Sequence, residues 1–138
     1  MQKHVIFPSN SVPKLIYNNI VFDIILKYII IKSLESLVAT NDKIPTVIDL
    51  HQIYPLHEDK LKPFILNFEK VYVVEENFAE RGLFSIISTF LNREKWKGDL
   101  ISVGVSQVFE FLSSDRNGLL EKHNLDYLKL KEIWKSLW

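Results

Sequence analysis

The chain has 138 residues, of which 47% are hydrophobic and 25% are charged, and seventeen basic residues balance seventeen acidic ones. A chain of this length buries roughly two-thirds of its unfolded surface and folds as one domain without a disulfide or metal staple. The charge balance argues against a nucleic-acid-binding face or an acidic tail, and the absence of cysteine excludes disulfides, zinc–thiolate sites and thiol catalysis.

The N-terminal segment predicts a connector. Residues 5–7 favour a short edge strand, and prolines, serines and an asparagine then make a turn-rich stretch. The most apolar region, residues 15–31, is interrupted by polar or charged side chains about every four positions, which argues against a membrane-spanning helix. We therefore expect a connector over residues 1–18 and one domain over residues 19–138, with no secretory signal pattern at the start.

The first half of the domain predicts two strands and two helices. Residues 20–26 are β-branched and apolar on both faces, as in a strand covered on both sides, and residues 29–39 have helical spacing. Residues 46–50 form the next predicted strand. His57 to Asp59 place acidic charge at the start of the next helix, where the helix dipole favours it. Its amphipathic pattern runs over residues 61–68, with Pro63 assigned to the first turn, where proline is tolerated.

The second half continues the alternation. Residues 71–74 predict a strand, residues 83–91 a helix with one apolar face, residues 101–105 a strand, and residues 105–112 a short helix. Trp96 is expected to fold back on the surface.

Two short segments close the chain. Asn117 is the expected cap of a helical turn, and Asp126 is the expected cap of the last helix. The predicted buried stripe of that helix consists of Leu130, Ile133, Trp134, Leu137 and Trp138.

Alternating strands and helices with short connections predict an α/β fold. We expect a single three-layer α/β/α domain with a mainly parallel sheet of four to five strands. Functional loops of such sheets gather at the carboxyl ends of the strands.

The most chemically loaded loop is the stretch after the third predicted strand. Its candidate ligand or interface residues are Glu75, Glu76, Asn77, Arg81 and Gly82. Neighbouring carboxylates can shift one another's pKa for acid–base work, but adjacent residues of an extended chain point to opposite faces. Arg81 and Gly82 before a helix suit an anion. The structural alternative is that Glu75 caps the following helix or pairs with Arg81.

Other motifs carry little chemistry. His51, His57, Glu58 and Asp59 combine imidazoles and carboxylates, but the histidine spacing matches no standard metal site, so a solvated loop is favoured. The four glycines form neither G-x-G-x-x-G nor a P-loop, and no G-x-S-x-G elbow is present. The residues alone therefore predict no metal site and no catalytic residue.

Two stretches of the sequence resemble a known family. PTVIDLHQIYPL followed by a helix, and then KVYVVEENFAERGLFSIISTFL, look like the C-terminal domain of the transketolase family, which includes transketolase, deoxyxylulose phosphate synthase and 2-oxo acid dehydrogenase beta subunits. ISVGVSQVFEF and GLLEKHNLDYLKLKEIW are similar to its closing section. The chain departs from the family at Lys27-Tyr28 and at Arg81, where the family usually has glycine.

The resemblance implies a thiamine diphosphate enzyme system in which this chain binds no cofactor. Thiamine diphosphate and Mg²⁺ would lie on a partner subunit or on other domains, because Gly98-Asp99-Leu100 is not the family's metal–diphosphate motif. We expect part of a transketolase-like transferase that is not catalytic by itself, acting as an assembly or regulatory domain in a cytoplasmic homo- or hetero-oligomer, without nucleic acid or membrane partners. The alternative is a stand-alone module that binds a small anion or a protein through residues 75–82.

Overall fold

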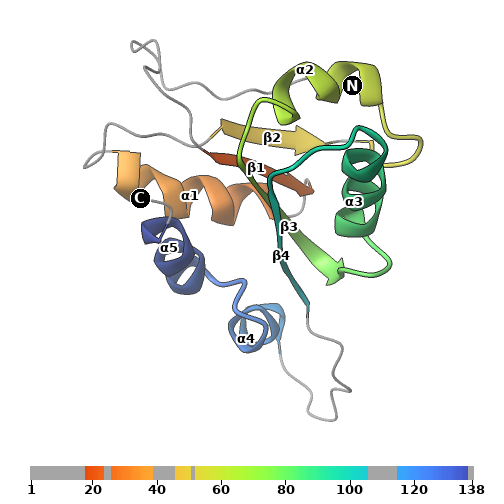
Figure 1. Cartoon of the computed structure of the whole chain (residues 1–138). Helices are drawn as coiled ribbons and strands as arrows, with labels where there is room; N and C mark the ends of the chain where they lie inside the picture. Colours follow the sequence, from red (N-terminus) through yellow and green to blue (C-terminus); the bar gives the residue numbers. More distant parts are fainter. Residues whose placement is uncertain (1–17, 24–25, 39–45, 51, 106–114, 137–138) are drawn as a thin grey trace.

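The computed structural model describes residues 18–23, 26–38, 46–50, 52–105 and 115–136. Within these residues, strands and helices alternate along the first three-quarters of the chain, and two helices follow (Figure 1). The strands are β1 (Asn18–Asp23), β2 (Thr46–Leu50), β3 (Lys70–Phe78) and β4 (Asp99–Val105). The helices are α1 (Lys27–Val38), α2 (Glu58–Ile65), α3 (Leu83–Arg93), α4 (Arg116–Lys122) and α5 (Tyr127–Lys135).

The described strands form one parallel sheet in the order β2-β1-β3-β4. At its centre, Val21 of β1 is aligned with Ile48 of β2 on one side and with Val73 of β3 on the other. The chain reverses its direction of winding at β1, since β2 lies on one side of it and β3 on the other. This places the topological switch point between β1 and β3.

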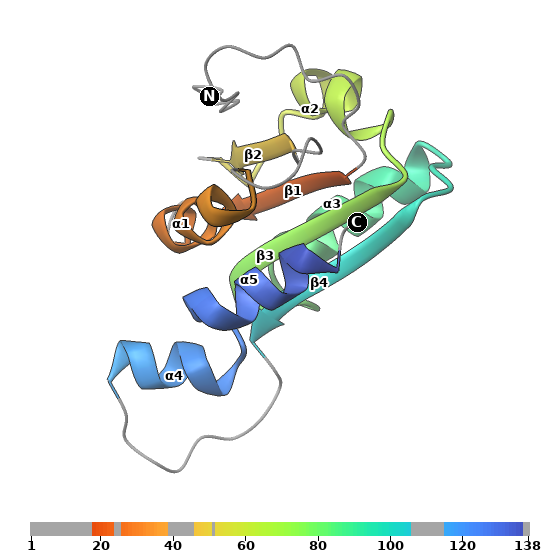
Figure 2. The same cartoon turned by 90° about the vertical axis from the view of Figure 1, so that its left-hand side faces the viewer.

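Helices cover both faces of the sheet (Figures 1 and 2). Buried residues of α1, α4 and α5 share one core cluster with Tyr72 and Val74, and buried residues of α2 and α3 share the other with Val71 and Val73. Successive side chains of β3 therefore pack alternately into the two core clusters. The expected three-layer α/β/α domain with a parallel sheet is confirmed, with four strands in the described residues.

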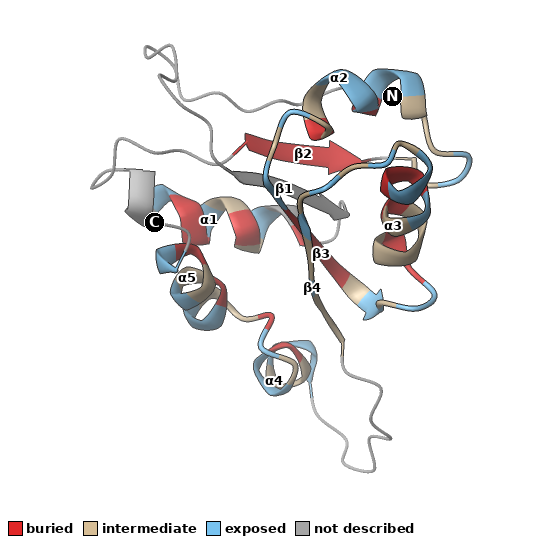
Figure 3. Cartoon of the chain, in the orientation of Figure 1, coloured by how far each residue is buried: buried red, intermediate tan, exposed pale blue. Residues whose placement is uncertain are grey.

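Burial is uneven across the sheet (Figure 3). Every residue of β2 is buried, and β3 is buried from Val71 to Glu75, whereas no residue of the edge strand β4 is fully buried. The largest fully buried side chains in the described residues are Trp134 and Phe90, one in each core cluster.

A buried hydrogen-bond chain joins α5 to α1. The indole Nε1–H of Trp134 donates to Ser33 Oγ at 2.7 Å, and the Ser33 hydroxyl donates to the carbonyl oxygen of Ile30 at 2.7 Å. The Trp134 ring meets Tyr72 edge-on, with ring centroids 6.0 Å apart. The indole N–H of this fully buried tryptophan is therefore satisfied by a hydrogen bond.

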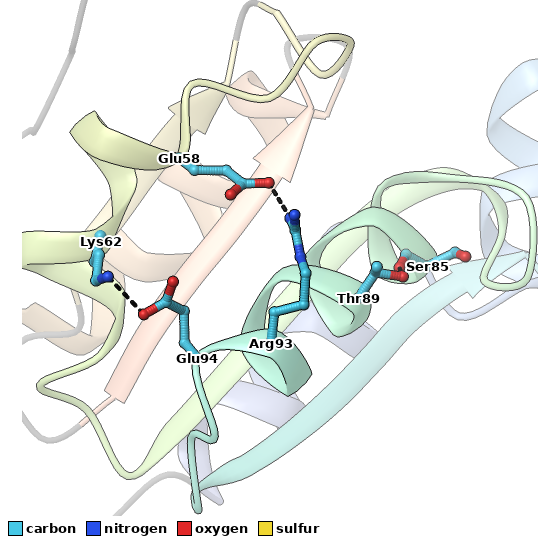
Figure 4. Close-up of polar contacts among 6 residues, drawn as sticks. All are labelled: Glu58, Lys62, Ser85, Thr89, Arg93 and Glu94. Carbon is cyan, nitrogen blue, oxygen red and sulfur yellow. Dashed lines mark hydrogen bonds and ion pairs between the residues drawn. The ribbon is translucent and has the colours of Figure 1, made fainter.

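Two ion pairs of opposite polarity connect α2 and α3 at the surface (Figure 4). Glu58 of α2 accepts from Arg93 of α3, and Lys62 of α2 pairs with Glu94 after α3 at 2.6 Å. Exposed pairs of this kind are each worth about 0.2–1 kcal/mol, so they orient α2 on α3 more than they stabilise the domain.

Several predicted details differ from the structure. Pro63 is not in the first turn of its helix, because α2 begins at Glu58 and ends at Ile65. Asn117 is not a cap: the carboxylate of Asp115 accepts from Gly118 N at 2.8 Å and caps α4. Asp126 does cap α5, by accepting from Leu128 N at 3.2 Å.

Some predictions fall outside the described residues. These are the edge strand at residues 5–7, most of the short helix at residues 105–112, and the last two members of the α5 stripe, Leu137 and Trp138. Of the stripe members that are described, Leu130 and Trp134 are buried and Ile133 packs against the same core.

Candidate functional site: the carboxyl edge of the sheet

The third strand is longer than the sequence pattern predicts, and this changes the character of the candidate loop. β3 continues through Phe78, which is aligned with Val105 of β4 after a register shift beyond Val74. Glu75, Glu76 and Asn77 therefore belong to the strand, and only residues 79–82 connect it to α3. The candidate residues lie at the carboxyl edge of the sheet, as expected.

Glu75 is fully buried and caps α3. Its Oε2 accepts a hydrogen bond from Leu83 N at 2.6 Å, and its Oε1 accepts one from Phe84 N at 3.0 Å. A carboxylate at this position satisfies two of the free N–H groups of the first turn and complements the helix dipole. The capping role that the sequence allowed for Glu75 is thus confirmed.

Gly82 makes room for this cap. It is the N-cap residue of α3 with an extended backbone, and a Cβ atom placed on it would lie 2.0 Å from Glu75 Oε2. A Cβ on Gly104 of β4 would lie 2.9 Å from the carbonyl oxygen of Asn77. Both glycines are required by close approach and not by a left-handed backbone.

Glu76 points to the opposite face of the sheet, where it pairs with Arg116 at the start of α4. The expectation that adjacent carboxylates face apart is confirmed. Sequence reasoning missed Arg116 and the capping residue Asp115. Asp115 stands three residues before Gly118, which is the spacing of a side-chain cap and was available as a signal.

Asn77 and Arg81 are exposed at this edge. The backbone N–H of Arg81 donates to the carbonyl oxygen of Phe78 at 3.0 Å, which closes the turn into α3. Among the described residues only Lys95 and Asn124 have positive φ without being glycine. Arg81 therefore replaces the family's usual glycine without backbone strain, and Lys27 likewise begins α1 in helical conformation.

The hydrogen bonds of Glu75 limit what the carboxyl edge can do as an acid–base site or an anion site. Glu75 is committed to Leu83 and Phe84, so an added anion would have to displace its carboxylate from the helix N-terminus. Burial, and secondarily the nearby Asp99 carboxylate, raises the pKa of Tyr72, which lies in the core cluster shared with α1, α4 and α5.

The same edge presents two aromatic side chains to solvent. Tyr54, in the connection from β2 to α2, is 86% exposed, and Phe78, at the end of β3, is 40% exposed. Gln52 Nε2 donates to the carbonyl oxygen of Pro55 at 3.2 Å and fixes the connection that carries Tyr54. Exposed aromatics are enriched in protein interfaces, so this edge is suited to contact with another protein.

The second candidate group is described only in part. His51 lies outside the described residues, Glu58 pairs with Arg93, and Asp59 is exposed. In the part of the chain that the structure describes, no three His, Asp or Glu side chains are grouped closely enough to hold a metal ion.

Comparison with known proteins identifies the domain. A segment of 64 residues is 36% identical to 1-deoxy-D-xylulose-5-phosphate synthase from Chlamydia trachomatis serovars L2 and D, and covers 46% of this chain and 10% of each relative. The structure aligns with one described as "Split gene transketolase, inactive beta4 tetramer" with a TM-score of 0.72 and 24% identity, over 88% of this chain and 39% of that one. These two findings support a transketolase-family domain in this chain.

Two further findings limit how much the likeness to the transketolase family shows. No family model matches the chain. The part that matches in sequence spans about a tenth of the length of the curated relatives, and the solved structure supports the fold alone at its level of identity. The resemblance inferred from the sequence is nevertheless confirmed at the level of the family.

The segment Gly98-Asp99, compared above with the family's metal–diphosphate motif, is held by close packing and by a backbone hydrogen bond. In Gly98-Asp99, the glycine lies against the Trp96 ring, where a Cβ would come within 2.1 Å of Cζ2. The backbone N–H of Asp99 is used by the carbonyl oxygen of Glu69 at 2.8 Å. This segment leads into the edge strand β4.

None of the described helices has the length and apolar character needed to cross a membrane.

Proposed function

We propose that this domain is the C-terminal section of a transketolase-like thiamine diphosphate-dependent enzyme, with a non-catalytic assembly or regulatory role beside a partner that carries the cofactor sites. The observation that supports the proposal most is how much of each chain the structural match covers. They cover most of this chain in structure, yet only 39% of the split-gene transketolase chain. The domain thus corresponds to a part of a larger enzyme.

The candidate site supports a structural role. Its only fully buried carboxylate, Glu75, holds the start of α3, and Glu76 holds α4, so both acids fasten helices to β3. Thiamine diphosphate and Mg²⁺ are therefore assigned to the partner, which is a separate subunit or another domain. The split-gene transketolase structure is described as a tetramer. We propose that this chain likewise works within a homo- or hetero-oligomer in the cytoplasm.

The proposed contact surface is the carboxyl edge of the sheet. It carries the exposed rings of Tyr54 and Phe78 and the exposed side chains of Asn77 and Arg81. Large aromatic side chains contribute much of the binding energy in protein interfaces, with costs of about 2 kcal/mol or more when they are truncated at a hot spot.

Affinity capture tests the partner. The full chain, immobilised through an added terminal tag, is incubated with native extract, and the bound proteins are identified by mass spectrometry. We expect a protein with thiamine diphosphate-binding domains, and we expect the purified pair to transfer ketol or acyl groups when thiamine diphosphate and Mg²⁺ are added. The chain alone should show no transfer. Turnover by the isolated chain, or recovery of no thiamine enzyme, contradicts the proposal.

Matched variants locate the contact surface. Tyr54→Ser with Phe78→Ser should weaken capture of the thiamine enzyme at least about thirtyfold, because losing one interface hot spot costs about 2 kcal/mol. Leu128→Ser is the control, because Leu128 is 64% exposed on α5, on the other face of the sheet. Equal losses in both variants would refute the placement of the interface while leaving the partner assignment intact.

A further inference from the structure

The first turn of α4 contains Asn117 followed by Gly118, and no other asparagine of the chain precedes a glycine. The backbone nitrogen after an asparagine can attack the side-chain carbonyl carbon Cγ, because the product is an unstrained succinimide ring. A glycine nitrogen meets the least hindrance in this reaction, since glycine has no Cβ and a permissive backbone. Asn117 is also exposed to water. Of the asparagines in this chain, Asn117 therefore has the sequence neighbour that best suits deamidation.

The reaction needs no partner except water. The Gly118 nitrogen gives up its proton and forms a bond to Asn117 Cγ, and the side-chain nitrogen takes up that proton and leaves as ammonia. Water then opens the succinimide at one of its two carbonyl carbons. Opening at the backbone carbonyl gives isoaspartate, in which the main chain gains a methylene, and opening at Cγ gives aspartate. No electrons are transferred, so no oxidant or reductant is required.

The folded structure holds the attacking nitrogen back. The backbone N–H of Gly118 donates to Asp115 Oδ1 at 2.8 Å, so the cap of α4 fixes both its proton and its direction. The helical backbone at Asn117 also turns the Gly118 nitrogen away from Cγ, because ring closure needs a ψ angle outside the helical range. Deamidation therefore requires the first turn of α4 to open.

Few contacts of α4 resist that opening. Leu120 is the single buried side chain that this helix contributes. Its start is attached to β3 by the surface pair of Arg116 and Glu76, and pairs of this kind contribute little in water. Short segments with few buried contacts open locally at a lower free energy than the whole domain. The Asp115 cap is thus a main restraint on the reactive state.

We propose that Asn117 is a deamidation site whose rate is controlled by the Asp115 cap, and that isoaspartate at this position releases the start of α4. The N–H of Leu119 donates to the carbonyl oxygen of Asp115 at 3.1 Å, and residue 117 lies inside the loop that this bond closes. An added methylene lengthens that loop, so the first turn loses its register. The modified residue also adjoins Arg116, whose pairing with Glu76 attaches α4 to β3.

The test follows isoaspartate in the full chain during incubation at physiological pH and temperature. A protein-isoaspartate methyltransferase labels the product, and peptide mapping by mass spectrometry locates it at Asn117. Asp115→Ala should speed its formation about fivefold, because losing a helix cap costs about 1 kcal/mol of local stability. Asp115→Asn keeps an acceptor oxygen and should restore the original rate. Asn67 and Asn77, which are exposed and precede phenylalanine, are internal controls that should keep their amides.

A second variant and a second measurement complete the test. Gly118→Ala should slow the modification below the rate of the unaltered chain, because alanine favours the helix and its Cβ hinders the attacking nitrogen. Hydrogen exchange at the Leu119 amide should be faster in the isoaspartate form than in the unmodified chain. Equal rates in Asp115→Ala and the unaltered chain, an intact Asn117 amide in both, or an unslowed Gly118→Ala overturn control by the cap. Unchanged exchange at Leu119 overturns the release of α4. None of these results bears on the assembly role, which is tested at the carboxyl edge.

Discussion

Replacing Glu75 tests the central structural claim, that a buried carboxylate of β3 anchors α3. In Glu75→Gln the amide oxygen can accept from one of Leu83 N and Phe84 N, but the amide nitrogen faces the other donor. A hydrogen bond to a charged group is worth about 1.5–3 kcal/mol, so we expect the free energy of unfolding to fall by about 2 kcal/mol. Equilibrium unfolding in urea, followed by circular dichroism, measures the loss.

Gly82 provides an independent route to the same perturbation. In Gly82→Ala the new Cβ would lie 2.0 Å from Glu75 Oε2, so the carboxylate must leave the helix start, at a cost of about 3 kcal/mol. In Glu75→Ala that clash is gone, and adding Gly82→Ala should cost much less. We expect a coupling energy of about 2 kcal/mol in this double-mutant cycle, with faster hydrogen exchange at the Leu83 and Phe84 amides. Additive costs would refute the capping argument.

Three further predictions concern other parts of the fold. Ser33→Ala orphans the buried Trp134 N–H and should lower the free energy of unfolding by about 1–2 kcal/mol in urea titrations, with no comparable loss in the Trp134→Phe background. Lys95→Gly removes a left-handed backbone cost of about 1–2 kcal/mol, part of which is offset by chain entropy, and should raise the melting temperature. Arg93→Gln breaks the exposed pair with Glu58 and should lower the free energy of unfolding by less than about 1 kcal/mol. This difference should disappear in 1 M salt, and a difference that persists there would contradict the assignment to a surface ion pair.

Much of this fold follows from local patterns. Apolar runs of four to seven residues separated by helical periodicities predict the alternation, and β2 coincides with its predicted range. The boundaries of β3 do not follow, because Glu75, Glu76 and Asn77 read as loop residues when considered alone. The strand continues past them because Phe78 pairs with Val105 of β4 beyond the register shift and α3 supplies donors for Glu75, and neither partner is adjacent in sequence.

Other features depend on still longer separations. Trp134 and Ser33 are 101 positions apart, and no periodicity links them, although each lies on a helix that the sequence predicts. The start of α2, by contrast, follows from a local signal and is confirmed. The apolar stripe begins at Leu61, but acidic residues at Glu58 and Asp59 extend the helix by one turn, since they complement its dipole. The stripe locates a helix, and the flanking charges decide where it begins.

The pair Glu75–Glu76 shows how the two kinds of information combine. Strand alternation alone requires that one side chain face each helical layer, and the structure places Glu75 on the α3 side and Glu76 on the α4 side. Alternation does not say which carboxylate is buried; that depends on Gly82, whose missing side chain opens the space above β3. The two acids therefore attach the helices on the two faces of the sheet to β3. A shared catalytic role would require both on one face, which the extended backbone through Glu76 forbids.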